Sequence, residues 1–273
     1  MASEYRTAAD GRALVLREDI EAAVRSLGVD AGDSLMVHCS LSKIGFVCGG
    51  AQVVVEALMH CVGADGTLMM PSQSWKNLDP SSGVHWQEPE EWYEAIRENW
   101  PAYDRRITPT NTMGAVAELF RTWPGTLRSG HPARSVAAWG RHAARLTEHH
   151  DVSDIFGESS PLGKFYALDG KILLVGVGYD KNTMLHLADV RADYPSKHDV
   201  EESSAMLVDG QRKWVSYRTL FVDGGDFEEI GAAFEKECPD AVRRTMLGNA
   251  ELRLMRARLL VDFAVQWIER NRR

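Results

Sequence analysis

The chain has 273 residues, of which 44% are hydrophobic and 26% are charged, as expected of a folded globular protein rather than a disordered one. Its 31 Lys and Arg residues against 39 Asp and Glu residues give a net charge of −8, which disfavours a nucleic-acid partner and favours encounters with cationic ligands, although solubility alone could explain it. No apolar run approaches the ~20 residues of a membrane span. No pair of cysteines has the spacing of a zinc site. We therefore expect a cytoplasmic protein with no membrane partner and no metal.

The first third of the chain alternates between helix-like and strand-like segments. An amphipathic helix is predicted over 17–26 and a short buried strand over 34–38. Gly49 and Gly50 then open a second amphipathic helix that continues to residue 62, and an apolar strand follows over 67–71. A strand, a glycine-rich loop, a helix and a strand in this order predict a βαβ unit and a mainly parallel sheet covered by helices.

The rest of the chain continues the α/β pattern after one long interruption. Residues 72–109 are rich in Trp, Pro, Asp and Glu and lack sustained periodicity, so they predict a functional loop insertion with one possible helix over 90–100. The further predicted elements are a helix over 114–122, a central strand over 171–178, a helix over 182–191, a hairpin of 206–208 with 213–217, and a long helix over 250–270. We interpret residues 1–273 as one domain.

The first candidate site is the loop between the strand at 34–38 and the helix that opens at Gly49 and Gly50. Free amides and the positive dipole end at a helix N-terminus favour a phosphate, and glycines let it approach the backbone. The spacing matches neither common nucleotide-binding fingerprint, so the glycines could equally serve only to turn the chain. His38 beside the loop is more often a hydrogen-bonded histidine at a strand end than a catalyst.

The second candidate site is the polar segment 128–135, which includes Arg128, His131 and Ser135. Its side chains could bind a ligand or could tie down a loop by hydrogen bonding to backbone groups. From spacing alone, the second reading is favoured.

The third candidate site begins just after the strand at 171–178. Thr183, His186 and Asp189 are spaced i, i+3 and i+6, so they share one helical face, and ligands of α/β sheets collect at the carboxyl ends of strands. A histidine there could accept a proton from an amine, or it could be a hydrogen-bonded core residue. A covalent mechanism through Cys39 or Cys48 is disfavoured because the Gly-x-Ser-x-Gly motif is absent and no triad is evident.

These same segments resemble the aminoglycoside 3-N-acetyltransferase family, over nearly the whole chain from residue 35 to residue 268. No single motif is decisive, but their number and order are specific. The segments that carry the resemblance are 37–45 with 49–51, 66–71, 108–110 with 113–118, 128–135, 160–162, 183–189 and 248–250.

The resemblance implies an αβα layered fold with a central mixed, mainly parallel sheet, unlike the GCN5-type acetyltransferases. It also implies acetyl-CoA as the donor and direct transfer to the 3-amino group of the 2-deoxystreptamine ring of an aminoglycoside, a resistance activity. It places the coenzyme on two segments, and the residues implied are His38, Ser40, Leu41, Ser42, Lys43, Ile44, Gly45, Thr108, Met113 and Gly114.

The same resemblance assigns roles around the third site. His186 would be the general base, Thr183 would lie beside the thioester carbonyl, and Asp189 would help to hold the cationic sugar. A carboxylate beyond the hairpin would orient the histidine, with Asp223 as the best match and Asp226 as its rival. The acidic and aromatic loop would form a wall for the acceptor, and its candidate residues are Trp75, Asp79, Glu88 and Asp104.

Two other functions remain open at this point. The chain could be an acetyltransferase of the same family that acts on another amine metabolite, because a fold does not determine the acceptor. It could also be a non-catalytic protein that binds CoA or polyamines. The shared face of Thr183, His186 and Asp189 argues against simple binding, which needs no base. The sequence does not distinguish a monomer from a homodimer.

Overall fold

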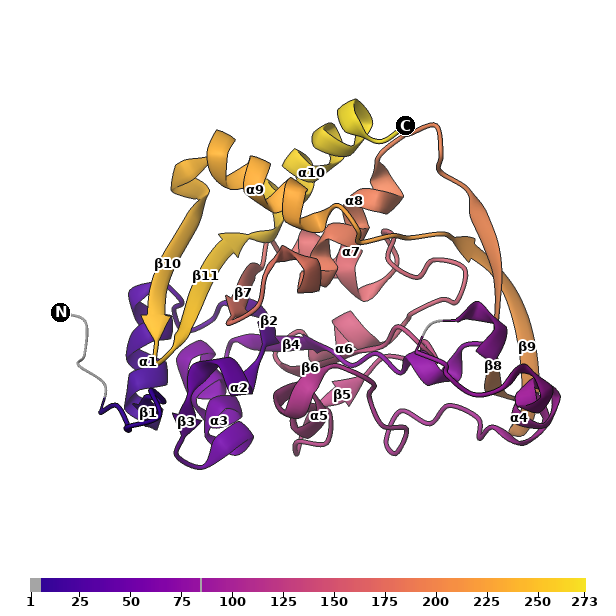
Figure 1. The fold of residues 1–273 in the computed structure, drawn as a ribbon, viewed down its shortest axis with the longest axis horizontal. Coiled ribbons are helices and arrows are strands. Elements are labelled where there is room, and N and C mark those ends of the chain that lie inside the picture. Colours follow the sequence, from indigo (N-terminus) through magenta and orange to yellow (C-terminus); the bar gives the residue numbers. More distant parts are fainter. Residues whose placement is uncertain (1–5, 84) are drawn as a thin grey trace.

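A seven-stranded mixed sheet forms the centre of the molecule, which we describe from a computed structural model over residues 6–83 and 85–273 (Figure 1). Its strands, in the spatial order β10-β11-β7-β2-β4-β6-β5, are β2 (Ser34–Cys39), β4 (Thr67–Pro71), β5 (Leu127–Arg128), β6 (Val136–Gly140), β7 (Lys171–Val175), β10 (Val242–Leu247) and β11 (Ala250–Arg256). Only β11 and β6 run against the direction of the other strands. The prediction of a mixed sheet is therefore confirmed. Five of the seven strands share one direction, whereas only two of the six neighbouring pairs, β2 with β4 and β2 with β7, are parallel.

Helices cover both faces of the sheet, which confirms the predicted αβα layers. One layer contains α1 (Arg17–Ser26), α2 (Leu41–Ile44), α3 (Gly50–Val62) and α5 (Gly114–Arg121), below the sheet in Figure 1. The other layer contains α6 (Ala143–Thr147), α7 (Pro161–Ala167), α8 (His186–Arg191), α9 (Phe227–Glu237) and α10 (Ala257–Asn271). Among the described residues, no helix has both the length and the apolar content that a membrane crossing requires.

The central strands are apolar throughout because each of their faces contacts a helical layer. In β2, Leu35 and Val37 belong to the core shared with α1, α3 and α5, whereas Met36 between them belongs to the core shared with α7 to α10. Successive side chains of a strand point to opposite faces, so a strand buried on both sides shows a continuous apolar run. The same alternation holds in β7, where Leu173 and Leu174 enter different cores.

The predicted βαβ unit is confirmed, since β2 and β4 are parallel neighbours joined through α3. One element was predicted wrongly. Residues 250–270 are not one helix, because residues 250–256 form β11 and only the remainder forms α10. Leu252 and Leu254 of β11 pair with Val175 and Leu173 of β7, so this segment completes the sheet before the helix begins.

The hairpin and the long insertion lie together beyond the sheet. The hairpin is confirmed and is longer than predicted, with β8 (Asp199–Val208) and β9 (Gln211–Leu220) forming a ribbon at the right of Figure 1. The insertion folds into η1 (Trp75–Asn77), η2 (Pro80–Ser82), η3 (Glu90–Trp92) and α4 (Tyr93–Asn99). It is attached to the ribbon by backbone hydrogen bonds from the Asp79 amide to the Ser203 carbonyl and from the Tyr103 amide to the Ala205 carbonyl. The remaining strands, β1 (Leu14–Val15) and β3 (Phe46–Val47), form a small parallel pair.

Candidate active site

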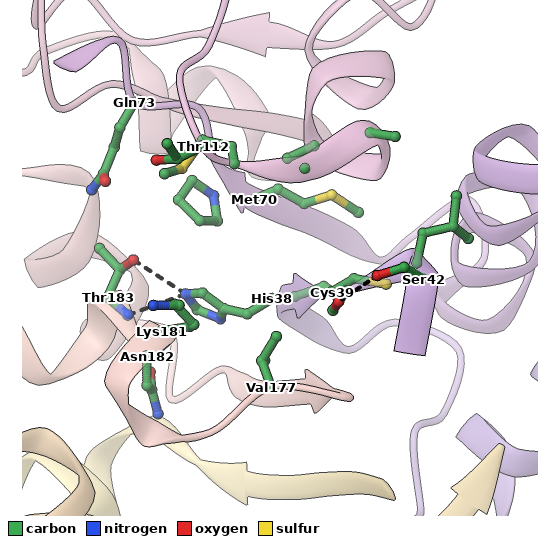
Figure 2. Close-up of a pocket in the computed structure, with 18 of the residues that line it drawn as sticks. His38, Cys39, Ser42, Met70, Gln73, Thr112, Val177, Lys181, Asn182 and Thr183 are labelled. Carbon is green, nitrogen blue, oxygen red and sulfur yellow. Dashed lines mark hydrogen bonds between the residues drawn. The ribbon is translucent and has the colours of Figure 1, made fainter. Parts of the chain in front are cut away.

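A cavity of about 1030 Å³ opens at the carboxyl ends of β2, β4 and β7. Figure 2 shows His38 and Cys39 from the end of β2, Met70 from β4 and Val177 from just beyond β7 around one space. Ligands of α/β sheets bind in this position because the loops that leave these strands diverge there. The cavity is therefore the candidate active site.

His186 stands on the wall of this cavity with its ring held from three sides. Its Nδ1 lies 2.8 Å from Oδ2 of Asp189, a fully buried residue. The ring stacks on Phe156 with centroids 4.6 Å apart and planes 4° apart, and Phe227 packs against it at 4.8 Å. Because a carboxylate only accepts hydrogen bonds, Nδ1 carries the proton and Nε2 keeps a lone pair. Within residues 6–83 and 85–273 no group hydrogen bonds to Nε2, so this atom is available to a ligand.

The local sequence explains why the ring is placed there. The side chain of Asn182 accepts a hydrogen bond from the Met184 amide and starts the 3-10 turn η5 (Thr183–Leu185), which continues into α8. Leu187 and Ala188 point into the core and fix the rotation of the helix. His186 and Asp189 are then three residues apart on the same face, which brings their side chains together.

His38 and Thr183 form a second polar pair on the cavity wall (Figure 2). The Thr183 amide donates to Nε2 of His38 at 3.1 Å, and the Thr183 hydroxyl oxygen lies 3.2 Å from the same nitrogen. An amide can only donate, so His38 is a neutral acceptor with its proton on Nδ1. Burial lowers the pKa of His38 to about 3, which keeps the ring uncharged at neutral pH. His38 is thus a hydrogen-bonded histidine at a strand end, and His186 is the histidine with a free basic nitrogen.

Most residues that the resemblance assigned to the coenzyme line the cavity. Those that do are His38, Ser40, Leu41, Ser42, Gly45, Met113 and Gly114. Three do not. Ile44 is fully buried and Lys43 is exposed outside the lining. The Thr108 side chain accepts a hydrogen bond from the Asp104 amide, and the Thr108 carbonyl accepts from Arg128.

The predicted acidic wall is absent from the cavity, and only Trp75 of its four candidate residues lines it. Asp79 forms a two-point ion pair with Arg97, with both distances below 3 Å. Glu88 pairs with Lys76 at 3.0 Å. Asp104 accepts a hydrogen bond from the amide of Arg106 within its own turn. These carboxylates hold the insertion in shape, so the structure corrects the expectation that they face an acceptor.

The carboxylate that contacts His186 also differs from the expected one. Asp189 holds the ring and has no exposed surface, whereas it was expected to hold the sugar. Asp223 was expected to orient the histidine, but its carboxylate accepts from the Gly225 amide instead. Its rival Asp226 is joined to the pair through Arg272, which hydrogen bonds to both Asp226 and Asp189.

Several residues of the site were not identified from the sequence. The lining also includes Gln73, His85, Thr112, Asp180, Lys181, Asn182 and Phe227. The group 180–182 directly follows the central strand, and the rule that ligands collect at carboxyl ends could have found it. Phe227 and Phe156 carry no such signal, because their contacts with His186 arise only from the fold.

The segment 128–135 ties down loops, as favoured from the sequence. Arg128 donates to the Ser72 and Thr108 carbonyls, and Ser135 donates to the Ser72 carbonyl as well. His131 accepts hydrogen bonds through Nδ1 from the amides of the two residues that follow Pro132. The segment thereby fixes both ends of the insertion next to the cavity. No group of three or more potential metal ligands occurs in the described part of the chain.

A half-buried histidine with an unoccupied ring nitrogen, on the wall of a large cavity at the carboxyl ends of the strands of a mixed sheet, is the arrangement expected of an α/β enzyme. Comparison with known proteins then gives the family. Residues 36–269 match the family model described as aminoglycoside 3-N-acetyltransferase, and the chain belongs to this acyltransferase family.

Relatives and solved structures agree with this assignment. The chain is 39% identical over 256 residues to the SPbeta prophage-derived aminoglycoside N(3')-acetyltransferase-like protein YokD of Bacillus subtilis, with 93% of each chain covered. The solved structure of AAC-VIa bound to sisomicin superposes with a TM-score of 0.84 at 32% identity, over 94% of this chain and 98% of that one. The solved structure of AAC-IIIb with CoASH superposes with a TM-score of 0.83 at 28% identity, over 94% and 97%.

Proposed function

We propose that this protein transfers the acetyl group of acetyl-CoA to the 3-amino group of the 2-deoxystreptamine ring of aminoglycoside antibiotics and thereby confers resistance. The observation that carries this proposal is the free Nε2 of His186 on the cavity wall, with Nδ1 anchored on the buried Asp189. The enzyme would act in the cytoplasm as a monomer or homodimer, with no nucleic-acid or membrane partner.

The cavity has features suited to a CoA thioester. It extends from His186 to Gly50 at the start of α3, a helix of 13 residues whose first amides have no partner within the helix and can therefore bind a phosphate. Between these ends the wall offers apolar side chains such as Val37 and Met70 together with the hydroxyls of Ser40 and Ser42. A long ligand with an apolar middle and an anionic end fits this distribution.

The chemistry follows from the two polar pairs on the wall. The nitrogen of the acceptor amine attacks the thioester carbonyl carbon while Nε2 of His186 accepts a proton from that amine. Asp189 stabilises the imidazolium that forms. The Thr183 hydroxyl would turn its hydrogen from Nε2 of His38, which keeps the Thr183 amide as a donor, to the carbonyl oxygen as negative charge develops on that oxygen. The carbon–sulfur bond then breaks, and the proton on His186 is returned to the departing thiolate. No covalent enzyme intermediate is required, and burial raises the pKa of the Cys39 thiol to about 12, which disfavours a thiolate nucleophile.

An aminoglycoside acceptor is supported by the net charge of −8 and by the sisomicin-bound neighbour. One observation favours a second candidate of the same chemistry. Asp180 is the only carboxylate residue among the described side chains that line the cavity, and it is 2.8 Å from Lys181. An acceptor amine with fewer positive charges would need fewer carboxylates than a polycation.

The test is release of free CoA thiol from acetyl-CoA in the presence of a panel of amines. The panel contains aminoglycosides with and without the 3-amino group and amines that carry a single charge. We expect thiol release only with aminoglycosides that have the 3-amino group. Release with the singly charged amines alone would show that the acceptor is an amine metabolite of lower charge and not an aminoglycoside. His186→Ala should lower turnover by at least about 100-fold while CoA binding persists, because a placed base contributes ~10²–10⁴ in rate.

The exposed histidine His60, which pairs with Glu21, provides the matched control. His60→Ala should keep the turnover of the native protein. Near-native turnover of His186→Ala would remove His186 from the mechanism.

A further inference from the structure

One guanidinium group, that of Arg272, joins the base to a second acidic residue. Its Nη1 donates to Oδ1 of Asp189 at 2.6 Å. Its Nε and Nη2 donate to the two oxygens of Asp226 at 2.7 Å each, and Nη2 also donates to the Asp223 carbonyl at 3.2 Å. The Tyr194 ring covers the guanidinium at 5.2 Å. Every nitrogen of this arginine is therefore engaged.

The contacts form a continuous chain from the cavity to α9. Oδ2 of Asp189 holds His186, and Oδ1 of the same carboxylate is bound by Arg272, so both oxygens of a fully buried group are occupied. Asp226 immediately precedes α9, and Arg272 follows α10. Burial alone would lower the pKa of Arg272, but the hydrogen bond to Asp226 and the charges of Asp189 and Asp226 outweigh it and raise the pKa well above its usual range. Arg272 is thus a permanent cation next to the carboxylate that holds His186.

We propose that Arg272 is a positioning residue that sets the basic strength of His186 by neutralising one of the two neighbouring carboxylates. This inference rests on the proposed role of His186 as general base. A nearby carboxylate favours the imidazolium, and a nearby guanidinium opposes it. With Arg272 present, the cluster of Asp189, Asp226 and Arg272 has a net charge of −1, and without it the charge would be −2. A base that is already protonated cannot accept the proton of the amine.

Other charged groups around the cluster are accounted for by contacts of their own. Arg191 of α8 pairs with Glu158. Lys197 donates to the Val190 and Ala192 carbonyls. The remaining titratable or charged side chains on the elements that surround the cluster are His38, Asp154, Asp180, Lys181, Asp193, Tyr194, Asp223, Glu228, Glu229, Glu235, Lys236, Glu237, Arg258, Asp262, Glu269 and Arg270. In the described ranges, Arg272 is the only cationic side chain within ion-pair distance of Asp189 besides His186 itself.

The experiment is the dependence of kcat/KM on pH between 5.5 and 9.5, with release of CoA thiol as the signal. In Arg272→Met, the acidic limb should move to higher pH by about one unit or more, from the loss of a unit charge a few ångströms from the ring. At a pH below the native midpoint of this limb, activity would then fall by about tenfold, and it would return toward the native value on the alkaline side of the shifted limb. The double variant Arg272→Met with Asp226→Asn restores the net charge of −1, so its limb should return toward the native position.

Asp226→Asn alone gives an independent result with the opposite sign. Asp189 and Arg272 then remain and their charges cancel, so the acidic limb should move to lower pH. This variant tests the proposal even where Arg272→Met does not fold. The control is Arg12→Met, because Arg12 forms an exposed ion pair with Asp10 and should leave the profile unchanged.

Loss of activity by the same factor at every pH, with no return in the double variant and no shift in Asp226→Asn, would overturn the proposal. Arg272 would then only hold α10 against α8. Failure of the proposed function looks different, since His186→Ala would itself stay active.

Discussion

The histidine His150 gives the molecule a stability that depends on pH. Its Nε2 lies 2.7 Å from the Ile155 carbonyl, which can only accept, so Nε2 carries the proton. Its Nδ1 accepts from the Ser129 hydroxyl at 2.9 Å, and that hydroxyl oxygen in turn accepts from the Val136 amide. A proton on Nδ1 would break this series of bonds next to the segment 128–135. Burial lowers the pKa of His150 from its ordinary 6.5 to about 4.

The shift determines how much stability is lost in acid. Between pH 6.5 and about 4, the unfolded chain takes up a proton at this position and the native protein does not, so stability falls as the pH falls. The full effect is about 3 kcal/mol, from 2.5 pKa units at 1.36 kcal/mol each, and about 2 kcal/mol of it is already lost at pH 5. Burial also lowers the pKa values of His38 and His131, so the whole protein should lose more than this.

The variant His150→Gln isolates the contribution of one residue. Gln retains a donor for the Ile155 carbonyl but does not titrate, and loss of the bond from Ser129 should cost about 1 kcal/mol at pH 7.5. Urea unfolding at pH 7.5 and pH 5 measures the loss of stability over this interval for each protein. We expect the native protein to lose about 2 kcal/mol more than His150→Gln.

The neighbouring exposed histidine His149 serves as the control, and His149→Gln should behave like the native protein. An equal loss in the native protein and in His150→Gln would refute the reasoning, because it would mean that His150 takes up its proton equally in the native and unfolded states.

Three further predictions concern the site and its surroundings. Thr183→Val should lower kcat by about 10²-fold while Thr183→Ser keeps most of it, as expected when a hydroxyl donates to a developing oxyanion, and CoA thiol release measures both. Asp79→Asn should leave KM for the acceptor within about twofold but lower the unfolding free energy by about 1–3 kcal/mol, because a partly buried hydrogen-bonded ion pair with Arg97 is lost. A large rise in KM would instead indicate that Asp79 contacts the acceptor. Cys39→Ser should keep turnover within about threefold, and inactivity would indicate a covalent mechanism, since a serine hydroxyl is a much weaker nucleophile than a thiolate.

The central sheet and its helices could be predicted because their signals are local. The run 34–38 is apolar throughout, and α3 has a clear apolar face after two glycines, so each segment shows its structure in its own composition. The segment 250–256 misleads for the same reason. Its Ala, Leu, Glu, Arg and Met residues are strong helix formers, yet Leu252 and Leu254 are buried at strand spacing by pairing with β7. Tertiary context decided the conformation, and the composition did not reveal it.

The acidic loop shows a second limit. Its carboxylates suggested a binding wall for a cationic ligand. A carboxylate that forms an ion pair with an Arg or Lys of the insertion itself is not available to such a ligand. Arg97 lies 18 residues from Asp79, and Lys76 lies 12 residues from Glu88. Both separations far exceed the three or four residues that bring side chains together on one helix, so these pairs form only when the insertion folds back on itself. A charge count along the chain cannot separate such internal pairs from groups that are free to bind a ligand.

The environment of His186 shows which kind of sequence information is more reliable. The spacing of three residues placed Asp189 on the same helical face as His186, and the two side chains do form a hydrogen bond there. The assignment of Asp223 came from resemblance across a stretch between the hairpin and α9, where matching positions is less certain than counting along a helix. Arg272 lies 83 residues from Asp189 and 46 from Asp226, so no local pattern could have revealed that it joins them. Spacing along the chain therefore places Asp189 beside His186, whereas the contacts by which Arg272 joins Asp189 to Asp226 follow only from the fold.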